Sequence, residues 1–202
     1  DISCSSACVV TDDYFVSLDD NEGIMNNTSA IDIAIGRMPV SNKDDADAMI
    51  DKIERYIDAN DESMGPWRKV ITFVTDENGG EDVNIDKIYL DAYPQIATSS
   101  GQRAPECNAA ITNRVELGTS IINYIGHAGE VGWADERILT NEDIFSWRNS
   151  PKLHLMITAS CKFSRFDDHT RTSAGEYVFL NHYGGAIAMM TTARVTYASD
   201  SR

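Results

Sequence analysis

The feature that most constrains the fold is an alternation of short apolar runs with helix-like segments. The clearest runs cover residues 70–74, 120–125, 152–159 and 186–191, and a shorter one covers 31–35. Their β-branched and aromatic residues are typical of strands buried in a parallel sheet. Alternating strands and helices predict an α/β fold with a mostly parallel sheet flanked by helices.

Helix signals fill the intervals between these runs. We predict helices over residues 44–59, 84–93, 108–117, 141–147 and 173–181. In the first, with Ser41 as the expected N-cap, apolar residues recur at spacings of three and four and predict one buried face. These residues are Ala46, Met49, Ile50, Ile53 and Ile57.

Composition and charge exclude some classes of function. The 202 residues are 42% hydrophobic, which suits one continuous core, and the formal charge of -15 repels phosphate backbones, so no nucleic acid partner is expected. The carboxylates Asp12, Asp13, Asp19 and Asp20 cluster in sequence. Such a cluster fits a solvated surface and is also compatible with a structural calcium ion.

The cysteine spacing and the hydropathy bear on metal binding, disulfide pairing and membrane insertion. Cys4, Cys8, Cys107 and Cys161 do not match a zinc-binding pattern. Cys4 and Cys8 are close enough to pair in an oxidising compartment, and the sequence leaves that pairing open. No apolar run approaches the roughly 18 residues of a membrane span, and no signal peptide is expected at the first residues.

Two chemically active residues follow consecutive predicted strands. His127 comes after the run 120–125, and Cys161 after the run 152–159. Neighbouring parallel strands end at one edge of a sheet, so one strand-helix-strand unit can bring the two residues together. An imidazole that takes the thiol proton produces a nucleophilic thiolate. The competing interpretation is that Cys161 is a buried, inert side chain.

Other residues near these strand ends are candidates for the same site. Asp76 and Glu77, after the run 70–74, are placed to orient the imidazole, and Asp82 is placed to line a specificity pocket. The competing interpretation, which the residues alone favour, is a solvated acidic turn. Backbone N–H groups near Ala128 and Cys161 are candidates for stabilising an oxyanion.

Gly126 leaves room for substrate beside the histidine. Trp133 is expected either to wall a substrate pocket or to cap the core, and His154, between two leucines, to be a core or half-buried residue.

Several stretches resemble the gingipain-type cysteine peptidases of family C25, which belong to the caspase-like clan. They are Thr11-Asp12-Asp13-Tyr14-Phe15, Asp32-Ile33-Ala34-Ile35-Gly36-Arg37-Met38-Pro39-Val40 and Ile71-Thr72-Phe73-Val74. The most specific is Ile122-Asn123-Tyr124-Ile125-Gly126-His127-Ala128-Gly129-Glu130-Val131-Gly132-Trp133, followed by the strand end Ser160-Cys161. Ala128 stands where the family usually has glycine.

The resemblance implies roles for individual residues. It implies a caspase-like α/β fold in which His127 is the catalytic histidine, Cys161 the nucleophile and Glu77 or Asp76 the assisting acid. Asp82 falls near the position that selects a basic side chain in arginine-specific members. It further implies that residues 1–202 are a partial catalytic domain, with an upstream subdomain and a C-terminal remainder absent.

The resemblance is greatest to the sortases of the type IX secretion system. It implies work at the outer membrane surface of a Bacteroidetes-type bacterium, on the C-terminal signal domains of secreted proteins. An amine of lipopolysaccharide would be the acyl acceptor and other secretion components would be partners. No cofactor would be required for the chemistry. The alternatives are a secreted protease with basic-residue specificity, and a catalytically silent calcium-binding or docking module.

Overall fold

The computed structural model describes residues 12–19, 32–58, 63–75 and 86–195. The chain divides into two compact units, residues 1–39 and residues 40–202. In the first unit, Asp13–Phe15 form a single 3-10 turn, and Asp12 accepts a hydrogen bond from Arg37 Nε at 3.0 Å. Residues 32–35, which we expected in a strand, form none, and Ile33 and Ile35 are exposed, so burial does not favour one there.

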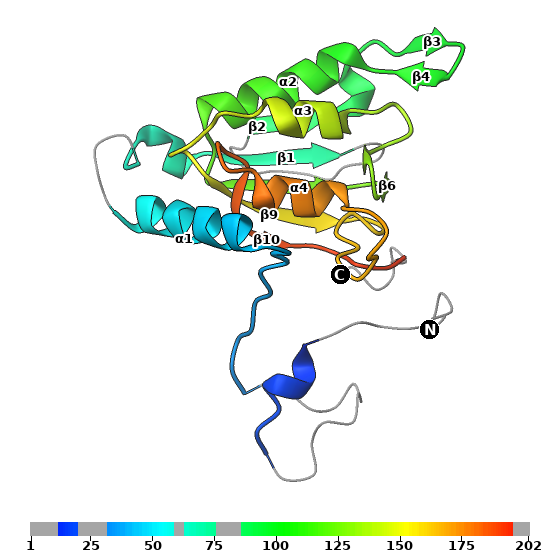
Figure 1. The fold of residues 1–202 in the computed structure, drawn as a ribbon. Helices are drawn as coiled ribbons and strands as arrows, with labels where there is room; N and C mark the ends of the chain where they lie inside the picture. Colours follow the sequence, from blue (N-terminus) through cyan, green and yellow to red (C-terminus); the bar gives the residue numbers. More distant parts are fainter. Residues whose placement is uncertain (1–11, 20–31, 59–62, 76–85, 196–202) are drawn as a thin grey trace. The chain divides into compact units, whose positions relative to one another are not determined.

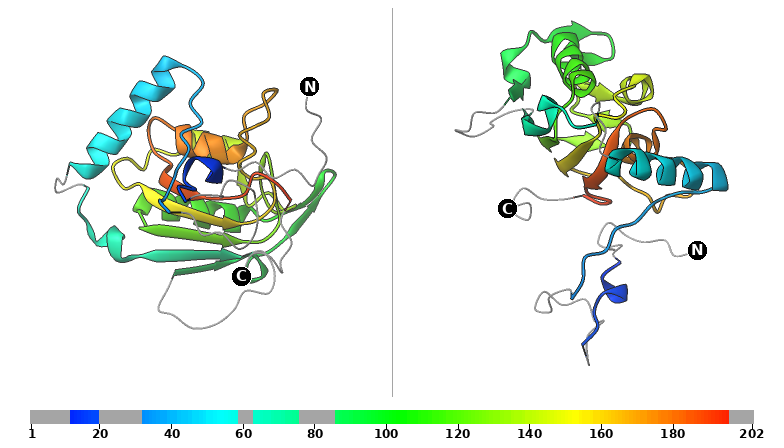
Figure 2. Two further views of the ribbon diagram at one scale, coloured as in Figure 1. Left: turned by 90° about the horizontal axis from the view of Figure 1, so that it is seen from below. Right: turned by 90° about the vertical axis from the view of Figure 1, so that its left-hand side faces the viewer.

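A five-stranded, wholly parallel sheet organises the second unit. Its strand order is β10-β9-β5-β1-β2, and the strands lie side by side in Figure 2. The strands are β1 (Ile71–Thr75), β2 (Asp86–Tyr89), β5 (Ile121–Ile125), β9 (His154–Ala159) and β10 (Ala186–Met190). The predicted parallel α/β architecture is therefore confirmed.

Four helices accompany this sheet in the described residues. They are α1 (Lys43–Ile57), α2 (Pro105–Leu117), α3 (Asn141–Ser146) and α4 (Ala174–Leu180). Short 3-10 turns lie at Pro66–Lys69 and Leu90–Ala92. The helices begin where local chemistry satisfies their first N–H groups: Pro105 opens α2, and capping boxes at Thr140 and Ser173 precede α3 and α4. Figure 1 shows α2 running beside β2 and β1.

Two small antiparallel sheets lie beyond the main one. The hairpin pairs β3 (Ile96–Thr98) with β4 (Gly101–Arg103). The three-stranded sheet joins β6 (Ala128–Gly129), β7 (Gly132–Trp133) and β8 (Leu139–Thr140). The three-stranded sheet begins at Ala128, directly after His127, so it fixes the path of the chain that follows the histidine.

The hydrophobic core lies between one face of the sheet and α2, α3 and α4. Residues of β9 alternate between buried and half-buried along the strand, as expected when one face carries the core. The core includes Val74, Ile122, Tyr124 and Met156 from the sheet and Cys107, Ile111, Val115, Ile144, Ala174 and Val178 from the helices.

The structure corrects two predicted helices. In the segment predicted as helix 84–93, residues 86–89 instead form β2, which pairs with β1 from Thr72↔Asp86 to Thr75↔Tyr89. Ile88 and Leu90 thereby reach the core, a gain that outweighs the local helical spacing.

The first helix is capped by Asn42 rather than Ser41, and its buried residues are Met49 and Lys52. Ile50 and Ile57 are 52% and 72% exposed, and the main contacts of α1 with other described elements are with α4 and β10.

Within the described residues, no helix combines the length and apolarity that crossing a bilayer requires.

Candidate active site

His127 and Cys161 lie beyond the ends of two adjacent parallel strands. β5 pairs with β9 in a register that places Ile125 opposite Ala159, and each candidate residue stands two positions further along. The Gly126 N–H donates to the Ala159 carbonyl at 3.4 Å, which continues the pairing one residue past β5. Because adjacent strands lie about 4.8 Å apart, this register brings the two residues to one edge of the sheet as neighbours.

The two candidate side chains differ in exposure. His127 is exposed, whereas Cys161 is half-buried and carries a thiol. A half-buried thiol next to an accessible imidazole can lose its proton and still meet a substrate carbonyl. Cys107, in contrast, is fully buried in α2, and burial raises the pKa of its thiol to about 11.

The backbone carbonyl of His127 accepts two hydrogen bonds, one of them from a core side chain. The Tyr124 hydroxyl donates to the His127 carbonyl oxygen at 2.5 Å, and the Ala134 N–H donates to the same oxygen at 2.7 Å. Tyr124 stacks on Trp133, with ring centroids 4.2 Å apart and planes 6° apart. The sequence analysis did not predict this hydrogen bond, because Tyr124 belongs to the apolar run 120–125. The one sequence feature that could have indicated it is a tyrosine hydroxyl three residues before the histidine.

Of the two roles that the sequence left open for Trp133, the structure confirms the one in the core, and the role at a substrate pocket stays a prediction. Trp133 is fully buried and packs 5.6 Å from Phe163, so it belongs to the core. It also lines a cavity of about 750 Å³ next to the histidine. Other residues that line this cavity are His127, Ala128, Arg103, Arg137, Asn141 and Glu142.

The segment after Cys161 turns sharply. Lys162 has a φ of +51°, a left-handed conformation that is uncommon for a residue with a Cβ. Its N–H donates to the Arg194 carbonyl at 3.1 Å, and the Thr192 hydroxyl bonds to the carbonyl of Ser160. The chain after β10 therefore supports the turn that carries Cys161.

The remaining predicted site residues divide into two groups. Gly126 has a φ of +157° and Ala128 is half-buried at the start of β6, so both lie in the loop that carries His127. Asp76, Glu77 and Asp82 lie outside the described residues, as do Cys4, Cys8 and Asp20. Within the described part of the chain, no group of three or more His, Cys, Asp or Glu residues could hold a metal ion.

His154 is a core residue, as its sequence position indicated. It is fully buried at the start of β9, and burial, followed by the charge of Lys52, lowers the pKa of its imidazole to about 3. It therefore stays neutral near pH 7 and is remote from the carboxyl edge of the sheet.

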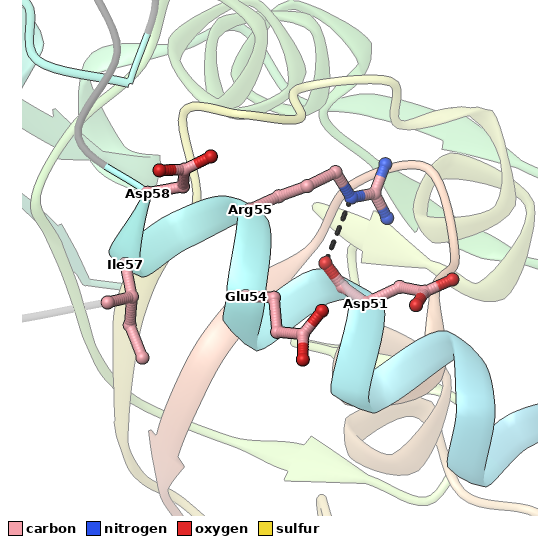
Figure 3. Close-up of a pocket in the computed structure, with 5 residues that line it drawn as sticks. All are labelled: Asp51, Glu54, Arg55, Ile57 and Asp58. Atoms are coloured by element: carbon pink, nitrogen blue, oxygen red, sulfur yellow. Dashed lines mark hydrogen bonds between the residues drawn. The ribbon is translucent and has the colours of Figure 1, made fainter.

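A second cavity, of about 680 Å³, lies on α1 (Figure 3). Its described lining residues are Asp51, Glu54, Arg55, Ile57 and Asp58, and Arg55 Nε donates to the Asp51 carbonyl at 3.1 Å. These are the exposed side chains of one helix and include no nucleophile, so this cavity has no part in the candidate chemistry.

The second unit is thus an α/β protein with a parallel sheet, in which a histidine and a cysteine follow two adjacent strands. The model of peptidase family C25 matches residues 4–202. The chain therefore belongs to peptidase family C25.

Solved structures share this fold. The complex of Porphyromonas gingivalis RgpB pro- and mature domains matches with a TM-score of 0.71 and 17% identity, over 96% of this chain and 47% of that chain. The Arg-specific cysteine proteinase gingipain R matches with a TM-score of 0.68 and 16% identity, over 92% of this chain and 44% of that chain.

A further structure, described as a protease, matches with a TM-score of 0.62 and 20% identity, over 94% of this chain and 41% of that chain. The chain thus spans less than half the length of these structures. No curated protein matches it in sequence.

Proposed function

We propose that this chain carries the catalytic centre of a thiol peptidase, with Cys161 as nucleophile and His127 as its base. The observation that carries the proposal is the β5–β9 register, which sets both residues two positions beyond the Ile125↔Ala159 pair. Membership of peptidase family C25 supports it.

The residues suit acyl transfer in two steps. His127 takes the proton of the Cys161 thiol, and the thiolate attacks the carbonyl carbon of a peptide bond. The tetrahedral intermediate collapses, the peptide C–N bond breaks, and the leaving amine takes the proton from His127. The acyl group remains on Cys161 as a thioester until water or an amine attacks it.

Further residues have proposed supporting roles in this reaction. Backbone N–H groups near Ala128 and Cys161 stabilise the oxyanion, and Glu77 or Asp76 orients the imidazole. Substrate contacts come from Gly126, Trp133 and Asp82.

The sequence resemblance supports a finer proposal, that the enzyme acts like PorU, the sortase of the type IX secretion system. It would remove the C-terminal signal domain of secreted proteins at the outer membrane surface and pass the acyl group to an amine of lipopolysaccharide. A structural calcium ion and other secretion components belong to this proposal. The alternative of a secreted protease with basic-residue specificity rests on Asp82 and on the likeness to an Arg-specific proteinase.

Alkylation of Cys161 tests the catalytic pair. The rate of iodoacetamide labelling is measured at each cysteine by peptide mapping, in the wild type and in His127→Ala. Cys161 should react faster than a model thiol at pH 7 and should lose that advantage in His127→Ala. Equal rates at Cys161 in the two proteins would overturn the proposal and favour a silent module.

A peptide panel then separates the two kinds of peptidase. Substrates vary at the residue before the cut, with and without a primary amine such as glycine amide. A strong preference for arginine or lysine with hydrolysis alone indicates the secreted protease. Amide products that form at the expense of hydrolysis indicate the sortase.

A further inference from the structure

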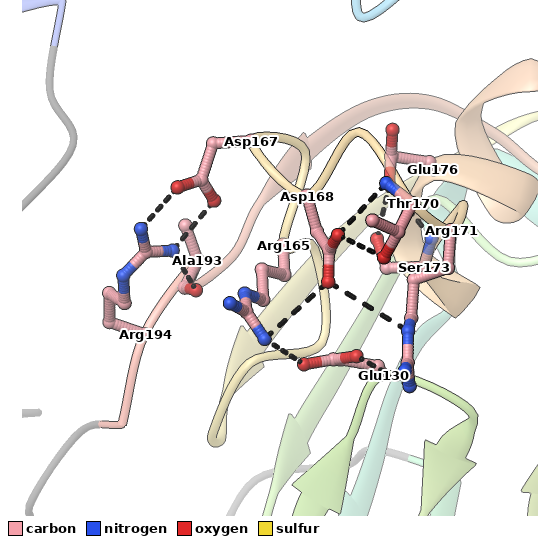
Figure 4. Close-up of polar contacts among 10 residues, drawn as sticks. All are labelled: Glu130, Arg165, Asp167, Asp168, Thr170, Arg171, Ser173, Glu176, Ala193 and Arg194. Carbon is pink, nitrogen blue, oxygen red and sulfur yellow. Dashed lines mark hydrogen bonds and ion pairs between the residues drawn. The ribbon is translucent and has the colours of Figure 1, made fainter. Parts of the chain in front are cut away.

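Glu130 lies in the turn between β6 and β7, three residues after His127. Its side chain is only 13% exposed, and each of its two carboxylate oxygens meets an arginine. Arg165 Nη1 lies 2.8 Å from Oε1, and Arg171 Nη1 lies 3.2 Å from Oε2. Figure 4 shows the carboxylate between these two guanidinium groups.

Both arginines belong to the segment that joins β9 to α4 and that begins with Cys161. Arg165 follows the cysteine by four residues, and Arg171 lies near the other end of the segment. The Glu130 carbonyl also accepts the N–H of Ala174, the first residue of α4, at 2.8 Å. One residue of the histidine loop therefore holds the cysteine loop at three points.

Asp168 completes this cluster from within the cysteine loop. Its Oδ2 lies 3.6 Å from Arg165 Nη1 and 3.8 Å from Arg171 Nε, and its Oδ1 accepts the Thr170 N–H at 3.0 Å. Two carboxylates thus face two guanidinium groups, and the charges of the cluster balance. The hydrogen bond to Glu130 is the main cause that raises the pKa of Arg165, and the bond from the Thr170 hydroxyl is the main cause that lowers the pKa of Asp168.

The two ion pairs of Glu130 argue against a role in binding a basic substrate side chain. An acid that selects a basic substrate side chain needs an uncompensated charge, whereas Glu130 already binds two arginines. Its contacts run between two loops of the protein. Trp133 and Phe163 make an apolar contact between the same two loops.

We infer that Glu130 is a positioning residue that sets the distance between His127 and Cys161 by tying the loop after the histidine to the loop after the cysteine. This inference rests on the proposed function. Proton transfer from thiol to imidazole depends on hydrogen-bond distance, and a misplacement of about 1 Å can cost on the order of 100-fold in rate. Glu130→Gln keeps the shape of the side chain and removes the charge that holds the two arginines.

Glu130→Gln is compared with Asp86→Asn, which breaks the Arg114–Asp86 ion pair at the amino end of β2. Peptide hydrolysis and the pH profile of Cys161 alkylation are measured for both variants. We expect Glu130→Gln to lower kcat at least tenfold with KM within twofold, and to slow Cys161 alkylation at pH 7 more than at pH 9. Asp86→Asn should leave these readouts within twofold of the wild type. Glu130→Asp, which restores the charge, should recover part of the rate.

Hydrogen exchange provides a readout that does not depend on turnover. Glu130→Gln should speed amide exchange in residues 162–173 and leave β9 unchanged. If Glu130→Gln does not fold, Arg171→Ala is used instead, because it removes one of the two ion pairs of Glu130 and the Arg171 side chain is 61% exposed, so its replacement leaves the core intact. Wild-type kcat, alkylation and exchange in the variant would overturn the inference. Failure of the proposed function would give a different result, because peptide hydrolysis would then be unchanged in Cys161→Ala and in His127→Ala.

Discussion

The hydroxyl of Tyr124 donates a hydrogen bond of 2.5 Å to the carbonyl oxygen of His127. Tyr124 is fully buried in β5, so this bond attaches the histidine loop to a side chain of the core. The position of the candidate base thus depends on packing beneath the sheet edge as well as on the strand that leads to it.

Tyr124→Phe should weaken the placement of His127. The substitution keeps the stacking on Trp133 but leaves the carbonyl with the Ala134 N–H alone, so we expect a loss of about 1 kcal/mol in the free energy of unfolding. Displacement of the imidazole should lower kcat by up to about tenfold. Urea unfolding and peptide hydrolysis measure these effects. Tyr183→Phe, at an exposed tyrosine, is the control, and equal behaviour of the two variants would contradict the prediction.

Two glycines of the histidine loop should respond differently to alanine. A Cβ on Gly132 would stand 2.0 Å from the Leu139 carbonyl oxygen, and its φ is +146°. Gly132→Ala should therefore cost more than about 2 kcal/mol of stability. A Cβ on Gly129 would meet nothing within 4 Å, so Gly129→Ala should stay within about 1 kcal/mol of the wild type. Thermal unfolding compares them, and a reversed order would show that β7 and β8 are not paired as described.

His154 should make the fold sensitive to acid. Its pKa is about 3 in the folded protein against 6.5 for an ordinary histidine, so between these values the unfolded chain binds more protons. Stability from this group is present above pH 6.5 and is lost as the pH falls toward 3, by on the order of 5 kcal/mol in full.

His154→Leu should flatten this part of the pH dependence. Near pH 7 its stability should stay within about 1 kcal/mol of the wild type, because both ring nitrogens of His154 lack a hydrogen-bond partner among the described residues. Urea unfolding from pH 4 to pH 7 provides the measurement. Parallel curves for the two proteins would rule out protonation of His154 on unfolding as a cause of acid sensitivity.

Cys107 should be inert toward alkylation in the native protein. It is fully buried, and its pKa of about 11 keeps it protonated at pH 8. We expect iodoacetamide to label it at least about tenfold more slowly than Cys161, and in urea at the rate of a model thiol. Rapid native labelling of Cys107 would show that α2 opens readily.

Much of the main sheet could be predicted from local pattern. The runs of apolar residues that became β1, β5, β9 and β10 are continuous because parallel strands are buried, and the helices predicted over 141–147 and 173–181 correspond to α3 and α4. The prediction failed where long-range contact overrode local preference. Residues 86–89 have a helical spacing, yet they pair with β1 because this pairing buries Ile88.

The sequence by itself determined the candidate pair of His127 and Cys161. The two residues follow consecutive strands, and neighbouring parallel strands end at the same edge of a sheet. Tertiary structure alone decided how that edge is held together. The contacts of Tyr124 with His127 and of Glu130 with Arg165 join residues through side-chain directions and loop paths, which no periodicity along the chain encodes. Such contacts form only once packing has fixed the distance between segments far apart in sequence.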